Sequence, residues 1–412
     1  MSTLKLNSIP ADVFSAKDTQ DVKVNANGVT LSRENIVATG RLAACEYIGM
    51  RLNENKTNLV KYQSRLAGQD MDYATLSKMH QDQKFLFCAT KAYEENGKAA
   101  PTLEEAKRDY GLSRNSTFLR VMASIDRDVI TPLFFRVLDD VSMNGLMNWE
   151  SVALGSTKEI TIRSNDAILF EDSAFGSGSS ATKNYLYAQT ITINPKPKQA
   201  NVVIKWFQDI INGDAGDYYA AIIRGMYNKI YAKFVDALTT AAGNTKYMPS
   251  ALKAASYTTP NWLTITTNVA AANGLKRRDL IAFGAVQALN EVVPVDSLGG
   301  AILGMQYGLG EKWFSNGFIP NAGGVDLFEV DPAIVPGTQN STIQMIFPTN
   351  KIYIAAKAGE GYAPLQGCYA EGTPINIELG INQTADYTID MKVTALFDIA
   401  PIFASKVGEI TI

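Results

Sequence analysis

The feature that most constrains this chain is an unbroken order of strand, short linker and long helix between Tyr185 and Gly243. One side of an alternating run holds Tyr185, Tyr187, Gln189, Ile191 and Ile193, the period-two pattern of a strand. Residues 194–197, with two prolines, are predicted to stop it, because proline cannot donate to a sheet ladder. A second apolar run over 202–207 then leads to Gly213.

The helix is predicted over 214–242. Asp214 and Asp217 suit its amino-terminal end, where acidic side chains complement the dipole, and Gly243 ends it. Helical spacing relates its apolar positions Tyr219, Ile222, Ile223, Met226, Ile230, Phe234 and Leu238. At 1.5 Å per residue this helix is about 40 Å long.

A long β-hairpin precedes the helix. One arm passes Ile160, Ile162, Ile168 and Phe170, and the other returns to Ile193 around a Gly/Ser-rich tip at 176–180. Arms of about 15 residues would reach about 45 to 50 Å. Because an isolated hairpin is only marginally stable, it must lie on its own domain or on a neighbouring subunit. An ordinary surface hairpin with a loose loop is the simpler alternative, but the long helix beside the hairpin favours an arm that packs on a neighbouring subunit.

This order resembles the tailed-bacteriophage major capsid proteins, the Hong Kong-97-type fold, over about residues 150–412. The resemblance is an order of elements and not a sequence motif. It implies an α+β fold with an N-terminal arm and helical region (1–135), an extended β-hairpin arm called the E-loop (150–200), a peripheral domain (136–149, 201–274 and 365–412) with the spine helix 214–242, and an axial domain (275–364).

The N-terminal region is predicted to be an extended arm over 1–30 followed by helices. A helical stripe begins after Ser32 and runs to Leu52, and further helical stretches cover 76–93, 103–110 and 118–138, the last interrupted by Pro132. The resemblance implies an arm that wraps neighbouring subunits; a compact independent helical domain is the alternative. We expect that maturation removes no large amino-terminal segment.

The second half is predicted to mix helices and short strands. Residues 275–293 show a helical stripe ended by Pro294, and a short helix is expected to pass through Trp313. Strands are expected at 325–330, 343–347 and 351–355. Alternation over 375–381 and 387–397 predicts a half-buried antiparallel pair.

Composition excludes several function classes. A net charge of −3 and a pI near 5.5 do not fit a dedicated nucleic-acid binder but suit a container for DNA. Cys45, Cys88 and Cys368 are odd in number and widely spaced, which indicates reduced, core-packed thiols. The sequence shows no signal peptide or membrane span.

Recognisable chemistry is absent from the sequence. The single histidine, His80, excludes His-based triads and multi-His metal sites, and is expected to be a surface or half-buried residue. Glycine-rich runs near 304–313 fail the phosphate-loop and dinucleotide patterns. The acid pairs 139–140 and 171–172 are expected at the solvated surface. We therefore predict no catalytic, cofactor-binding or metal-binding residue.

One covalent possibility follows only from the resemblance. Some capsids of this fold join a hairpin lysine to a peripheral asparagine by an isopeptide bond, and Lys183, Asn376 and Asn382 occupy such segments here. Most capsids of the fold use non-covalent contacts, which we therefore expect.

The predicted function is that of a major capsid protein. It would assemble with itself into hexamers and pentamers of an icosahedral shell, enclosing double-stranded DNA without sequence-specific binding. The implied partners are portal, scaffold or protease, and decoration proteins. The implied location is the virion, after assembly in the host bacterial cytoplasm. The alternatives are an encapsulin-type compartment shell, a phage tail sheath or tube subunit, and a cytosolic enzyme that uses carboxylates or a cysteine.

Overall fold

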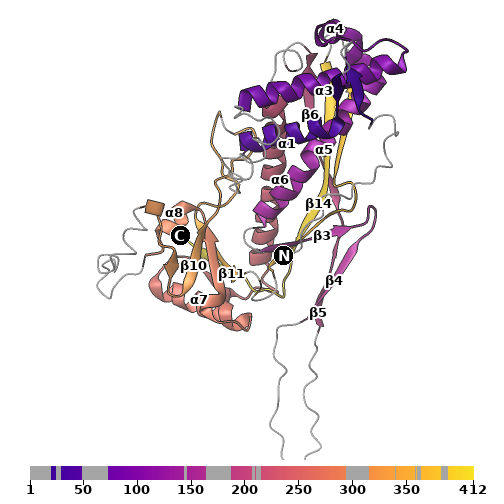
Figure 1. The fold of residues 1–412 in the computed structure, drawn as a ribbon. Coiled ribbons are helices and arrows are strands. Elements are labelled where there is room, and N and C mark those ends of the chain that lie inside the picture. Colours follow the sequence, from indigo (N-terminus) through magenta and orange to yellow (C-terminus); the bar gives the residue numbers. More distant parts are fainter. Residues whose placement is uncertain are drawn as a thin grey trace, which may run out of the picture. The chain divides into compact units, whose positions relative to one another are not determined.

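The computed structural model describes residues 20–24, 29–48, 73–142, 146–163, 187–206, 209, 215–293, 315–338, 340–357, 359, 363–381 and 388–412. The chain divides into two compact units. Unit 1 takes Met1–Asp140, Lys196–Tyr227 and Ala370–Phe397, and unit 2 takes Val141–Pro195, Asn228–Tyr369 and Asp398–Ile412. Helices and mainly antiparallel strands occur in both units (Figure 1), which confirms the predicted α+β class.

The amino-terminal part of unit 1 is a short hairpin followed by helices. Its elements are β1 (Val22–Val24), β2 (Val29–Leu31), α1 (Arg33–Ile48), α3 (Tyr73–Glu95), α4 (Leu103–Arg108), the 3-10 turn η2 (Tyr110–Arg114) and α5 (Ser116–Val141). The helices confirm the predicted stretches, while Leu52 lies outside the described residues. The prediction of a coreless arm is wrong for β1, because Val22 is buried.

Helix α5 continues through Pro132, so the predicted interruption is wrong. Proline has no N–H and therefore leaves the carbonyl of Asp128, one turn earlier, without its helical donor. The guanidinium of Arg41 on α1 supplies the missing bonds, since Nε and Nη2 donate to the Asp128 carbonyl at 3.0 and 2.7 Å. Arg33 Nη2 also binds the Asp128 carboxylate at 2.5 Å. Helix α1 thus supplies the hydrogen bonds to the Asp128 carbonyl that Pro132 cannot make within α5.

The sheet of unit 1 is built on the long strand β14 (Thr388–Pro401), of which Thr388–Phe397 belongs to this unit. Strands β6 (Lys196–Lys205) and β13 (Ile375–Ile381) both pair with it antiparallel, so that Met391 is opposite Val202 and Leu379. The predicted C-terminal pair is thereby confirmed. The strand before residue 194 ends at Ile193, so the predicted stop is confirmed. Pro197 lies inside the next strand, β6, opposite Leu396. β6 has no second neighbour among the described strands, and an edge strand tolerates proline.

Helix α6 (Ala215–Gly243) confirms the predicted long helix almost residue for residue. Every position of the predicted stripe is buried: Tyr219, Ile222, Ile223, Met226, Ile230, Phe234 and Leu238. The helix contributes its residues up to Tyr227 to unit 1 and the rest to unit 2. In unit 1, Trp206, which follows β6, packs edge-on against Phe85 of α3 with ring centroids 5.5 Å apart.

Unit 2 contains a second sheet in the order β7–β15–β11–β8–β10–β9. Its strands are β7 (Lys253–Ala254), β8 (Leu280–Gly284), β9 (Asn321–Ala322), β10 (Val325–Glu329), β11 (Lys351–Ala356) and β15 (Gly408–Thr411), and its helical elements are η4 (Ser250–Leu252), α7 (Thr259–Ala272), η5 (Arg277–Asp279) and α8 (Val286–Asn290). Helix α7 packs on this sheet so closely that a Cβ on Gly408 would lie 2.7 Å from Val269 Cγ2.

Two predictions for unit 2 need correction, and one helix was missed. The helix predicted over 275–293 is wrong for 280–284, where β8 pairs parallel with β10 and antiparallel with β11. The strand predicted over 343–347 is a single bridge between Ile334 and Met345. Helix α7 was not predicted at all. The strands at 325–329 and 351–356 are confirmed, while residues 299–304 and Trp313 lie outside the described residues.

The remaining strands of unit 2 are β3 (Met147–Val152), β4 (Lys158–Arg163), β5 (Tyr187–Ile193) and β12 (Leu365–Ala370). β12 is next to β3 in one sheet, and β4 pairs antiparallel with β5 from Lys158↔Ile193 to Arg163↔Tyr187. The predicted hairpin is thus confirmed for its base. Its tip lies outside the described residues.

Candidate functional site

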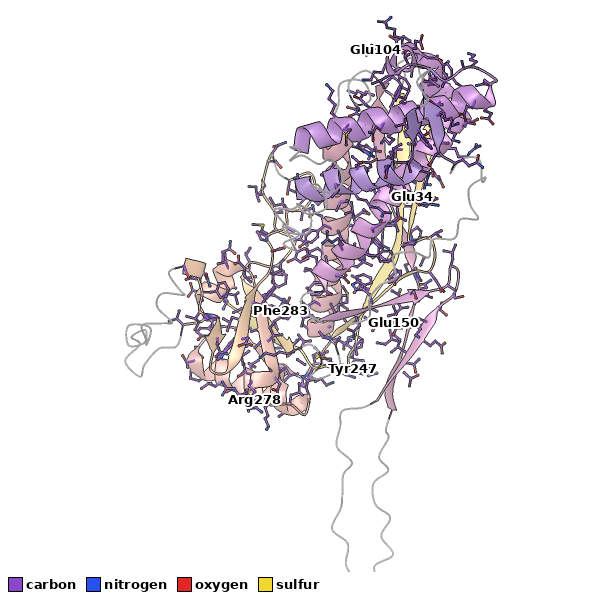
Figure 2. The ribbon with its side chains drawn as sticks, viewed as in Figure 1. Glu34, Glu104, Glu150, Tyr247, Arg278 and Phe283 are labelled. Atoms are coloured by element: carbon purple, nitrogen blue, oxygen red, sulfur yellow. The ribbon has the colours of Figure 1, made fainter. Side chains whose placement is uncertain are left out.

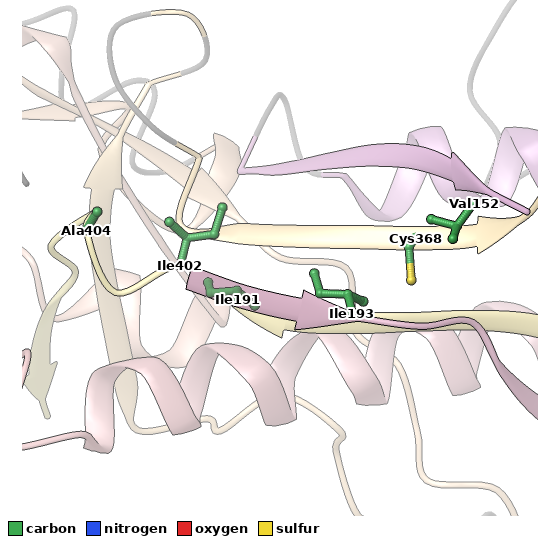
Figure 3. Close-up of a cluster of buried hydrophobic side chains, with 6 residues drawn as sticks. All are labelled: Val152, Ile191, Ile193, Cys368, Ile402 and Ala404. Atoms are coloured by element: carbon green, nitrogen blue, oxygen red, sulfur yellow. The ribbon is translucent and has the colours of Figure 1, made fainter. Parts of the chain in front are cut away.

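The base of the β4–β5 hairpin is the first candidate assembly element. Ile191 and Ile193 are buried while Thr190 and Thr192 are exposed, the alternation predicted from the sequence. Figure 3 shows both isoleucines facing a cluster completed by Val152, Cys368, Ile402 and Ala404. Ile160 of β4 packs on the same cluster.

The hairpin base therefore lies on the core of its own unit. The idea that the hairpin lies on a neighbouring subunit is wrong for Ile160, Ile191 and Ile193. It stays a prediction for residues 164–186, which lie outside the described residues.

The second candidate is a buried polar cluster in unit 1, where α1, α3, α5 and α6 meet. Lys84 Nζ binds Asp126 Oδ1 at 2.8 Å, and the side chains are 10% and 0% exposed. Tyr219 Oη donates to the same oxygen at 2.5 Å and accepts from Lys84 Nζ at 3.1 Å. His80 is fully buried, with Nδ1 2.8 Å from the Ile36 carbonyl and Nε2 3.1 Å from Tyr219 Oη.

His80 therefore corrects the prediction of a surface or half-buried residue. The Ile36 carbonyl can only accept, so Nδ1 carries the ring proton and Nε2 is left with a lone pair. The single Tyr219 hydroxyl proton goes to the Asp126 carboxylate, the shorter and charged acceptor. Burial, and then the Lys84 charge, lower the pKa of His80 to about 3, so the ring is neutral near pH 7.

The cluster is sealed from solvent, which argues against catalysis. A general base must reach a substrate proton, yet His80 and Asp126 have no exposed surface. Burial raises the pKa of Tyr219 well above its usual value, and burial likewise raises the pKa of Cys88, on the same helix as His80, so neither side chain supplies an anionic nucleophile. The cluster instead joins four helices through the contacts of Lys84 and Tyr219 with Asp126 and of His80 with the Ile36 carbonyl.

The structure places the other residues singled out in the sequence as follows. Cys88 and Cys368 are buried free thiols, as predicted, and the Cys45 side chain lies outside the described residues. Asp139 and Asp140 are exposed, as predicted. Asn376 is exposed on β13 and donates to Glu378 Oε1 at 3.0 Å. Lys183, Asn382, Glu171 and Asp172 lie outside the described residues, so the isopeptide possibility stays untested.

The residues that the structure describes contain no group of three or more His, Cys, Asp or Glu side chains arranged to hold a metal ion. None of their helices is long and apolar enough to cross a membrane.

Comparison with known proteins gave matches only among solved structures. No protein family and no curated protein matches the sequence. The chain is similar to the capsid of cyanophage P-SCSP1u at 10% identity and a TM-score of 0.41, covering 65% of this chain and 86% of that one. It is similar to the mature capsid of bacteriophage PhiM1 at 12% identity and a TM-score of 0.38, covering 65% and 85%.

The SrpI encapsulin complex of Synechococcus elongatus PCC 7942 is similar at 10% identity and a TM-score of 0.38, covering 68% of this chain and 88% of that one. The similar structures are thus mostly tailed-phage capsids, with encapsulins as a minority.

Proposed function

We propose that this chain is the major capsid protein of a tailed bacteriophage and forms the icosahedral shell around its double-stranded DNA. The observation that supports this most is the succession of the β4–β5 hairpin, the edge strand β6 and the 29-residue helix α6 with a fully buried stripe. This is the order of E-loop and spine helix that the resemblance implies.

The anchoring of the hairpin fits such a role. An element that links subunits must be held rigidly where it leaves its own subunit, and Ile191 and Ile193 fix the β5 arm in the core of unit 2. The helical part of unit 1 is held in a similar way by the Lys84–Asp126 pair and by Arg41. Both features are typical of a rigid support for contacts between subunits and not of a reaction site.

The partners follow from this role. The chain would contact copies of itself in hexamers and pentamers, together with portal, scaffold or protease, and decoration proteins. Its net charge of −3 would keep the shell from binding tightly to the packaged polyanion. The shell would assemble in the host cytoplasm and persist in the virion, and the chain would have no enzymatic activity.

Negative-stain microscopy of the expressed protein tests this proposal. Closed icosahedral shells are expected. Shells that instead retain an enzyme cargo would favour an encapsulin, and rods or tubes would favour a tail protein. Dispersed monomers with reproducible turnover would contradict the proposal outright.

A further inference from the structure

The two ends of the parallel pair β8 and β10 in unit 2 carry opposite charge. Lys276, Arg277 and Arg278 come just before β8, while Glu329 and Asp331 come at and after the end of β10. The strands run parallel in the register Asp326↔Ile281 to Glu329↔Gly284. At about 3.3 Å per residue, the two groups are separated by roughly the 15 Å length of a five-residue strand.

The acidic end contains a pocket. Its lining includes the acidic residues Glu329 and Asp331 together with apolar side chains, namely Val286, Val330, Pro332, Ala333, Met345 and Phe347. Met345 is 38% exposed, and Ile343, two residues earlier, is 61% exposed. Partial burial, and then the neighbouring Asp331, raise the pKa of Glu329.

At the basic end, Lys276 and Arg278 are both exposed, and Arg278 is the arginine that projects into solvent. Its side chain is 74% exposed and approaches Asp279 only at 3.7 Å. Two other cations of this end are engaged within the unit, since Arg277 donates to the Gly323 carbonyl and Lys357 binds Asp326 at 2.6 Å. Figure 2 shows Arg278 at the lower end of this unit, and in the same view α8, which borders the pocket, lies at the upper end (Figure 1).

We propose that this pocket receives the Arg278 side chain of a second copy of the chain. This contact rests on the proposed function, because it would be one of the assembly contacts between capsid subunits. The apolar lining suits the aliphatic stem of arginine, and the rim carboxylates suit its planar guanidinium. Because donor and pocket lie at opposite ends of one unit, each copy gives and receives at once. Such a head-to-tail contact closes into rings when the rotation allows.

A charge-swap experiment tests the contact in the full-length chain. Arg278→Glu and Glu329→Arg are each expected to raise the concentration at which shells form by about tenfold, because each places like charges together. The double variant restores the pair and is expected to assemble like the wild type. Lys229→Glu, the same charge change at an exposed position of α6 in the same unit, is the matched control and should assemble normally.

Sedimentation reports shells, and thermal melting confirms that each variant is folded. If a charge-reversed variant melts early, Arg278→Ala takes its place. This variant removes the side chain without reversing the charge and should also weaken assembly. Normal shells from both single variants, or no rescue in the double variant, would overturn this contact alone. If the wild type forms no shells under any condition, the proposed function fails, and this contact with it.

Discussion

At the scale of single residues, the most informative side chain is His80, a titratable ring with no exposed surface. Its neighbours Lys84, Asp126, Tyr219 and Cys88 come from three helices, so no local pattern in the sequence could have indicated its burial. The period of the sequence predicted the helix correctly, but it did not predict that His80 is buried. Burial of a polar residue inside a charged helix depends on partners far along the chain.

His80 should make the fold sensitive to acid. The ring has a pKa of about 3 in the folded state and about 6.5 when unfolded, so below pH 6.5 the unfolded chain binds a proton that the folded chain does not. Stability is therefore complete above pH 6.5 and is lost as pH falls towards 3. Between pH 7.5 and 5 this group should remove about 2 kcal/mol.

Denaturant unfolding of the wild type and His80→Gln at several pH values measures this loss. The variant should lack that part of the pH dependence while keeping the contribution of other groups. An identical pH slope in both proteins would show that His80 is solvated or already charged in the fold.

Two glycines in helices offer a matched pair. A Cβ on Gly40 would lie 2.5 Å from His80 Cε1, whereas a Cβ on Gly225 of α6 meets nothing within 4 Å. Gly40→Ala should destabilise by about 1–3 kcal/mol through overpacking. Gly225→Ala should stabilise by about 0.5–1 kcal/mol through helix propensity. Thermal melting distinguishes them, and shifts of the same sign would be inconsistent with the close approach at Gly40.

At the scale of elements, the contact between Arg41 and the Asp128 carbonyl explains how α5 tolerates Pro132. Arg41→Met should cost about 1–3 kcal/mol by leaving a carbonyl unsatisfied. In a Pro132→Ala background the new N–H can bond Asp128 directly, so the same change should cost clearly less. A double-mutant cycle by chemical denaturation measures the difference. Equal costs in both backgrounds would mean that Arg41 acts only through its other contacts.

Elements with a single clear period were predictable, and those decided by distant pairing were not. Helix α6 and the β13–β14 pair each bury one face, so their sequences show that face directly. The run Leu280–Gly284 fits a buried strand and a helix equally well, and only β10 and β11, which come later in the chain, make it a strand. Helix α7 had a usable signal that the prediction missed: Thr258 caps it and Pro260 lies in its first turn.

At the scale of the whole molecule, the hairpin separates folding from assembly. Removing residues 164–186 and joining Arg163 to Tyr187 through Asn-Gly keeps every pair of the β4–β5 ladder. The buried base should then hold the melting temperature unchanged, while shells should fail to close or become fragile. Circular dichroism and sedimentation give the two readings. Intact shells of normal stability would show that the hairpin tip contributes nothing between subunits, and an unfolded chain would show that it belongs to the subunit core.

The interleaved course of the chain through unit 1 sets the timing of its completion during synthesis. β6 ends at Lys205, yet its partner strand begins only at Thr388. At bacterial elongation rates of about 5–20 residues per second, the ribosome needs roughly 10 to 40 s to make the intervening chain. Throughout that interval the edge of β6 that pairs with β14 has no partner, although Trp206, just after β6, can already pack on Phe85 of α3. A nascent subunit thus stays incomplete until translation is almost finished, and during that time it is a natural client for chaperones.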